Sequence, residues 1–295
     1  MSNLQADQML ANKQIDKKER NPYWDNIKGL LIFLVVFGHF LWDYRNQGFA
    51  RYIVEFIYLF HMPAFIFVAG YLSKSSRSKS KYSILKLIII YIIFNTVLMF
   101  FSYFIEGTSF FLITPYYSSW FLLSLIVWRL AIKFLSKIPH LIFISIFVSI
   151  LIGFWGDVTN VLAISRTITF FPFFVSGYML SKDMLNRTIE DRKGKEYLIG
   201  ILLLFFVLII SGLFIIYNPN LNDANLLMDS YSSWFDVIAR LMIFSIASLM
   251  IIIILILTPK KSLPLVTTWG KNSLSIYVLH RFVTLIFPEI FLPIK

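Results

Sequence analysis

The sequence contains no cysteine and few charged residues: only 15% of its 295 residues are Asp, Glu, Lys or Arg. Without cysteine the chain can form neither a disulfide nor a thiolate zinc site, and it has no cysteine nucleophile. Hydrophobic residues make up 58% of the chain, well above their share in a soluble domain of this length. The lipid bilayer is therefore expected to be the main surroundings of the folded chain.

The net charge of +11 does not predict a nucleic-acid partner, because that function needs basic residues gathered on one soluble face. Here they lie in short stretches between apolar runs. Residues 1–20 are polar and of mixed charge, which predicts a disordered cytoplasmic tail. The first apolar run is long enough to span a bilayer and lacks a clear cleavage site, so it is expected to remain in the mature protein.

Nine apolar runs approach the roughly 20 residues that a membrane-spanning helix needs. We therefore predict an all-α integral membrane bundle of nine to ten transmembrane helices. Lys and Arg gather in alternate loops, which predicts a cytoplasmic N-terminus and an external C-terminus. The runs lie near 27–45, 53–72, 83–105, 118–136, 140–155, 160–181, 197–217, 234–257 and 272–290.

One short segment occurs twice: FVAGYLSK at 67–74 resembles FVSGYMLSK at 174–182. Each copy ends a predicted helix at a basic cytoplasmic loop. Internal duplication and convergent chemistry at helix ends both explain such a pair, and the sequence leaves both explanations open.

Ionisable residues inside apolar spans are unusual, since each costs about 2.5 to 3.5 kcal/mol at a helix centre. In the first span, Lys28 precedes His39 by eleven residues, which corresponds to roughly 16 Å of rise and an almost whole number of turns. Asp43 follows one turn later on the same side. This spacing predicts one polar face, with His39 near the middle of the bilayer.

Two further histidines, His61 in the second span and His280 in the last, are predicted at a similar depth. Each histidine alone could be a hydrogen-bonded packing residue or a metal ligand. A metal site is not expected, because no HExxH pattern occurs and only His39 has a carboxylate at ligand spacing.

Arg166 lies deep in the sixth span and indicates either an anion-binding residue or an ion pair with Asp157, Asp43 or Glu55. Both interpretations remain open from the sequence. Trp120, at the start of the fourth span, is expected to belong to the outer aromatic belt.

These motifs together resemble the acyltransferase 3 family of integral membrane acyltransferases, especially its fucose 4-O-acetylase and polysaccharide O-acetyltransferase branch. The family's arginine, ten intervening residues before the histidine, is replaced here by Lys28. The resemblance covers nearly the whole chain and rests on DNIKGLLIFLVVFGH (25–39), FHMPAFIFVAGY (60–71), SSWFLLSL (118–125), FFPFFVSGYML (170–180) and GKNSLSIYVLH (270–280).

The resemblance implies one transmembrane acyltransferase domain over residues 21–295, in the plasma membrane of a bacterium. The reaction would transfer an acyl group, usually acetyl from acetyl-CoA, to a hydroxyl of a sugar or cell-surface glycan, free or lipid-linked. No metal cofactor is implied. The expected site residues are His39 as general base, Asp25 or Asp43 to orient it, His61 or Arg166 to bind the oxyanion, Lys28 and Arg166 to bind the CoA phosphates, and His280, Trp120 and Tyr71 in support.

The main alternative is a transporter or flippase of a glycan or lipid-linked intermediate, in which buried charges would line a substrate path. A membrane protein that senses pH through its histidines is a third alternative. The motif of the first span favours the enzyme over both.

Overall fold

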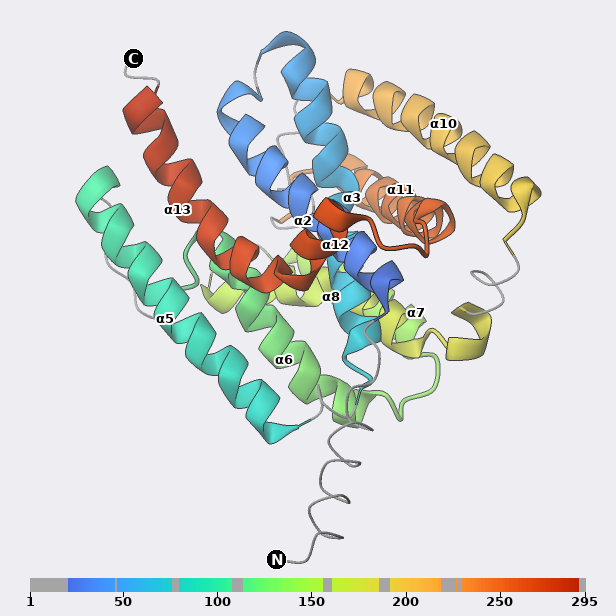
Figure 1. Ribbon diagram of the computed structural model, residues 1–295, viewed down its shortest axis with the longest axis horizontal. Coiled ribbons are helices and arrows are strands. Elements are labelled where there is room, and N and C mark those ends of the chain that lie inside the picture. The colour runs from blue at the N-terminus through green and yellow to red at the C-terminus, as the bar shows by residue number, and fades with distance from the viewer. Residues whose placement is uncertain are drawn as a thin grey trace, which may run out of the picture.

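The computed structural model describes residues 21–291 except 46, 76–79, 108–113, 156–160, 186–191, 219–226 and 228–229. Every regular element in these residues is a helix, so the predicted all-α fold is confirmed (Figure 1). The α-helices are α2 (Pro22–Leu41), α3 (Gly48–Leu72), α5 (Lys81–Glu106), α6 (Trp120–Leu135), α7 (Leu141–Leu151), α8 (Ile164–Met179), α10 (Gly194–Tyr217), α11 (Trp234–Leu257), α12 (Pro264–Lys271) and α13 (Ser273–Phe291). The 3-10 helices are η1 (Trp42–Tyr44), η2 (Tyr117–Ser119), η3 (Ile152–Phe154) and η5 (Val161–Ala163).

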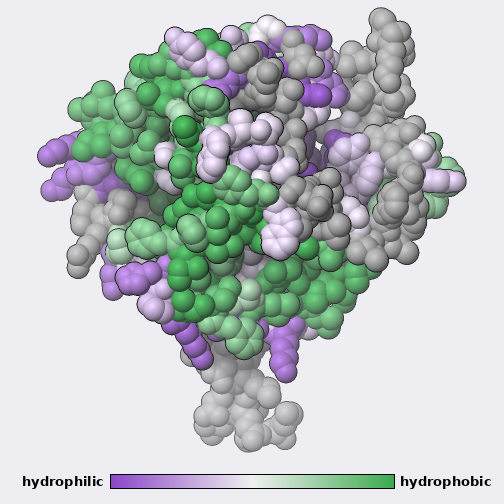
Figure 2. Space-filling view, turned by 180° about the vertical axis from the view of Figure 1, so that it is seen from behind, coloured by the Kyte–Doolittle hydropathy of each residue, from purple (hydrophilic) through white to green (hydrophobic). Residues whose placement is uncertain are grey.

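Six helices in the described part of the chain are long and apolar enough to cross a membrane. In α3, 72% of the residues in the apolar stretch are buried inside the protein, whereas in α10 only 28% are. Helix α3 is therefore central, whereas α5 and α10 lie at opposite edges (Figure 1). Their exposed residues include Ile93, Phe100, Phe205 and Ile209, and Figure 2 shows hydrophobic residues over much of one face. The chain is a multi-pass membrane protein.

Each of the nine predicted spans overlaps a helix, although the helix ends differ by several residues. The helices within 140–155, 160–181 and 272–290 are not among the six that are long and apolar enough to cross a membrane. Helix α2 begins five residues before the predicted start because Asn21 caps it, accepting a hydrogen bond from the Tyr23 amide at 3.0 Å. Pro22 occupies the first turn, where its missing N–H costs nothing. The short helix α12 was not predicted. The predicted tail, residues 1–20, lies outside the described residues.

The two copies of the repeated segment pack against each other where α3 crosses α8. A Cβ atom on Gly70 would clash with the carbonyl group of Phe174, and a Cβ atom on Gly177 would clash with the carbonyl group of Phe67. Both contacts involve backbone, so only glycine permits this approach. The contact is reciprocal, since each glycine meets the carbonyl three residues before the other glycine.

A second reciprocal crossing joins α2 to α12, with Gly29 against the Val266 carbonyl and Gly270 against the Asp25 carbonyl. Asn26 strengthens this junction, because its side-chain amide donates to the carbonyls of Pro259 and Lys261 at 2.9 and 2.8 Å. Figure 1 shows α12 lying across α2. The segment after α11 is thereby held against the start of α2, and α13 follows directly from α12.

Candidate active site

Three histidines come together from α2, α3 and α13. The ring centroids of His39 and His280 are 5.2 Å apart. Tyr58 of α3 contacts both His39 and His61: its ring centroid lies 6.0 Å from that of His39 and 4.8 Å from that of His61. His61 and His280 are buried, and His39 is half-buried. The similar depth predicted from the sequence therefore corresponds to a single cluster, in which His280 lies directly beside His39.

Hydrogen bonds to the backbone fix the neutral tautomers of His61 and His280. Nδ1 of His61 lies 2.7 Å from the Ile57 carbonyl oxygen, and Nδ1 of His280 lies 2.6 Å from that of Tyr277. A carbonyl oxygen only accepts, so each Nδ1 carries the proton. In a neutral imidazole Nε2 then holds a lone pair. Nε2 of His280 is buried and has no hydrogen-bond partner among the described residues.

This proton position bears on one predicted role. An oxyanion is stabilised by hydrogen-bond donors, and His61 with a proton on Nδ1 can donate from Nε2 only when that nitrogen is protonated too. Arg166, the other predicted oxyanion donor, needs no such change in protonation.

His39 differs from the other two histidines because a side chain binds its Nδ1. The Tyr58 hydroxyl oxygen lies 3.2 Å from that nitrogen. Neither predicted carboxylate takes this place. Asp43 lies in η1 and is exposed, and no hydrogen bond joins it to His39 among the described residues.

Asp25 lies at the opposite end of α2, fourteen residues or about 21 Å from His39, so it cannot orient that ring directly. It is buried and pairs with Lys28, whose Nζ lies 2.8 Å from Asp25 Oδ1. Tyr71, a predicted supporting residue, is at this end too, because it stacks on Trp24 with ring centroids 4.3 Å apart. The predicted site residues therefore form two groups, one at each end of α2.

A cavity of about 50 Å³ opens beside the histidines. It has room for about three or four groups of the size of a water molecule. Ser118 contributes a buried hydroxyl that has no hydrogen-bond partner among the described residues. The lining residues are His39, Tyr58, His61, Met62, Ser118, Trp120, Phe170, Leu227 and Tyr277.

One wall of this cavity comes from α6 and α8. Trp120 is only 5% exposed and packs on Phe170 with ring centroids 5.2 Å apart, so its predicted place in the outer aromatic belt is wrong. The Arg166 guanidinium lies over the Trp120 ring, 5.6 Å from its centroid. Of the ion-pair partners predicted for Arg166, Glu55 pairs with Arg51 at 2.8 Å, and Asp157 lies outside the described residues. A cation therefore lies against Trp120, one of the residues that line the cavity.

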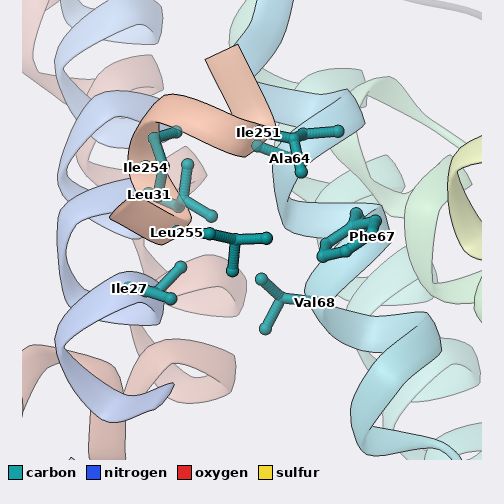
Figure 3. Close-up of a pocket in the computed structure, with 8 residues that line it drawn as sticks. All are labelled: Ile27, Leu31, Ala64, Phe67, Val68, Ile251, Ile254 and Leu255. Atoms are coloured by element: carbon teal, nitrogen blue, oxygen red, sulfur yellow. The ribbon is translucent and has the colours of Figure 1, made fainter. Parts of the chain in front are cut away.

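A second gap lies between α2, α3 and α11, where apolar side chains from the three helices point toward one another (Figure 3). Its volume is only about 10 Å³. Because no polar side chain reaches it, the gap offers no group that could activate a substrate. The lining residues are Ile27, Leu31, Ala64, Phe67, Val68, Ile251, Ile254 and Leu255.

The described residues contain no group of three His, Asp or Glu side chains arranged to hold a metal ion. The sequence model of one protein family, described as an acyltransferase domain, matches residues 21–294. The chain belongs to the acyltransferase 3 family. Comparison with curated proteins and with solved structures gave no match. The protein is thus a membrane acyltransferase, and the histidine cavity is its candidate active site.

Three of the polar residues that line this acyltransferase cavity were not predicted as site residues from the sequence: Tyr58, Ser118 and Tyr277. Tyr58 lies three residues before His61 and therefore on the same side of α3, which is a local signal that spacing alone could have found. Tyr277 similarly lies three residues before His280, and its hydroxyl donates to the Ser118 carbonyl. Ser118 precedes α6 and has no such signal, because only the fold brings it to the histidines.

Proposed function

We propose that this acyltransferase transfers an acetyl group from acetyl-CoA to a hydroxyl of a sugar or cell-surface glycan. The observation that carries the proposal is the cluster of three imidazoles, two of which line one small cavity, in a chain whose family transfers acyl groups. An imidazole can take a hydroxyl proton on one ring nitrogen and later release it, which suits a general base.

In the proposed reaction His39 Nε2 takes the proton of the sugar hydroxyl while the hydroxyl oxygen attacks the thioester carbonyl carbon. The carbon–sulfur bond of the tetrahedral intermediate then breaks. His39 returns the proton to the departing thiolate, so the products are the sugar ester and free CoA. Arg166, which lies over the ring of the cavity residue Trp120, supplies positive charge for the oxyanion.

The size and lining of the cavity support a short acyl group. An acetyl group has three non-hydrogen atoms, which is about what a cavity of 50 Å³ accommodates. Met62, Phe170 and Leu227 provide apolar surface for its methyl group. The Ser118 hydroxyl and the imidazole nitrogens provide hydrogen-bonding groups beside it.

Lys28 is proposed to bind a phosphate of CoA at the other end of α2, where it now pairs with Asp25. It lies eleven residues or roughly 16 Å from His39, a span that the extended pantetheine arm of CoA must cover. Arg166 lies at the histidine end, so we assign it to the reacting group rather than to the phosphates. The donor would thus run along α2 from the cytoplasmic side.

The acceptor would approach from outside, as a glycan that is free or lipid-linked, in the plasma membrane of a bacterium. The motifs of the fucose 4-O-acetylase and polysaccharide O-acetyltransferase branch support this acceptor class. Mass spectrometry of the host's surface glycans, with and without this protein, tests it. Loss of acetyl groups supports the enzyme, whereas unchanged acetylation with accumulated precursor would refute it and favour a flippase.

The variant His39→Ala tests the assignment of the base. We expect acetyl transfer from labelled acetyl-CoA to fall by about 10²- to 10⁴-fold, the usual contribution of a general base. The matched control is His140→Ala, because His140 is exposed and lies outside the histidine cluster. This variant should keep full activity. Full activity of purified, folded His39→Ala would remove His39 as the base.

A further inference from the structure

The side chain that holds His39 belongs to a tyrosine rather than to a carboxylate. Tyr58 Oη lies 3.2 Å from Nδ1 of His39. We propose that Tyr58 is the positioning residue for His39: its hydroxyl oxygen accepts the Nδ1–H and so keeps the Nε2 lone pair available to the acceptor hydroxyl. The inference rests on the proposed function, in which His39 is the base.

The direction of this hydrogen bond decides what His39 can do. A phenol hydroxyl both donates and accepts, unlike the carbonyl oxygens that hold His61 and His280. If Tyr58 donated to Nδ1, the proton of neutral His39 would be on Nε2, and the ring could not take a proton there. After His39 takes a proton, both of its nitrogens donate. Only an accepting Tyr58 fits the ring before and after the transfer.

This role matches that of the third group in hydrolase triads, which orients the base and fixes its tautomer. A neutral phenol performs it here without a buried negative charge beside the base. That is consistent with the positions of Asp25 and Asp43, neither of which contacts His39.

The packing around Tyr58 holds its ring in place. Trp42 packs on one side with its ring centroid 5.0 Å away, and His61 lies edge-on at 4.8 Å. On the α2 side, Gly38, the neighbour of His39, has no side chain and so leaves room for the Tyr58 ring. A Cβ atom at Gly38 would lie 3.2 Å from a carbon of the Tyr58 ring and 3.3 Å from Cγ2 of Ile57. Alanine at position 38 must therefore displace the tyrosine ring by a few tenths of an ångström.

Tyr58→Phe tests the proposal, because phenylalanine keeps the packing and removes only the hydroxyl. We expect kcat to fall by about 10- to 100-fold, as when an outer hydrogen-bond partner is lost. KM for acetyl-CoA and for the glycan should stay unchanged, since the hydroxyl contacts His39. The matched control is Tyr52→Phe, an exposed tyrosine on the same helix, which should keep wild-type kcat.

A double-mutant cycle separates positioning from a purely structural role. In the residual activity of His39→Ala, adding Tyr58→Phe should have no further effect, since the imidazole that it positions is absent. An equal loss in both backgrounds would show that Tyr58 acts on the fold, and would overturn the proposal. Gly38→Ala, which keeps the hydroxyl but shifts the ring, should give an intermediate loss of kcat.

The outcomes also separate this inference from the proposed function. Full kcat in Tyr58→Phe together with an inactive His39→Ala would refute the role of Tyr58 and leave His39 as the base. Full activity in His39→Ala would refute both. If each single variant loses activity and the double variant loses no more than His39→Ala alone, the result supports both the role of Tyr58 and the role of His39 as the base.

Discussion

Replacing Gly177 with alanine should push α3 and α8 apart at their crossing. The added Cβ atom would lie 2.8 Å from the carbonyl carbon of Phe67 and 3.0 Å from the amide nitrogen of Tyr71, closer than real Cβ atoms approach such neighbours. Backbone cannot rotate away as a side chain can, so the helices themselves must move. Overpacking of this kind costs about 1 to 3 kcal/mol, and the rigid neighbours place this site near the upper end.

Alanine also favours a helix over glycine by up to about 1 kcal/mol, which leaves a net loss of about 2 kcal/mol. We expect a Tm about 4 to 8 °C below that of the wild type, by the usual relation between stability and Tm for chains somewhat shorter than this one. Thermal unfolding of the purified protein in detergent measures this shift. Gly212→Ala is the control, because Gly212 lies within α10 and a Cβ atom there meets nothing within 4 Å.

Gly212→Ala should therefore be neutral or slightly stabilising. If Gly177→Ala unfolds at the same temperature as Gly212→Ala, the close crossing of α3 and α8 is not present in the folded protein. Gly70→Ala should behave like Gly177→Ala, since the contact is reciprocal.

Two further predictions concern the substrates. Met62→Ala enlarges the cavity. The kcat/KM for butyryl-CoA, divided by that for acetyl-CoA, should therefore rise by about 10-fold or more, because one methylene is worth about 10- to 200-fold in a tight pocket. An unchanged ratio would place the acyl group elsewhere. Lys28→Gln should raise KM for acetyl-CoA but not for acetyl-pantetheine, which lacks the nucleotide phosphates, while Lys28→Arg should keep the wild-type KM. Equal effects on both donors would refute a phosphate contact of Lys28.

The helices were predictable because each long span is a run of apolar residues, a local property of the sequence. The short helix α12 was not, since its eight residues are fewer than any membrane span needs and include two threonines and a lysine. Its place depends on Asn26 and Gly29, which lie more than 200 residues earlier in the chain.

The site was predictable in part. Equal depth along the predicted spans indicated that His39, His61 and His280 could meet, and the fold brings them together. Trp120 was misplaced because a tryptophan at a helix start is typical of the membrane interface, whereas contacts with Phe170 and Arg166 help to bury it here. The separation of Asp25 from His39 was already implied by their spacing, because fourteen helical residues span about 21 Å.

The reciprocal contact between the two Phe-Val-x-Gly-Tyr segments bears on the history of the chain. A contact in which position i meets j and position j meets i is the kind that a two-fold axis produces between identical subunits. An internal duplication accounts for this local symmetry, whereas convergent chemistry at helix ends does not require the two copies to touch.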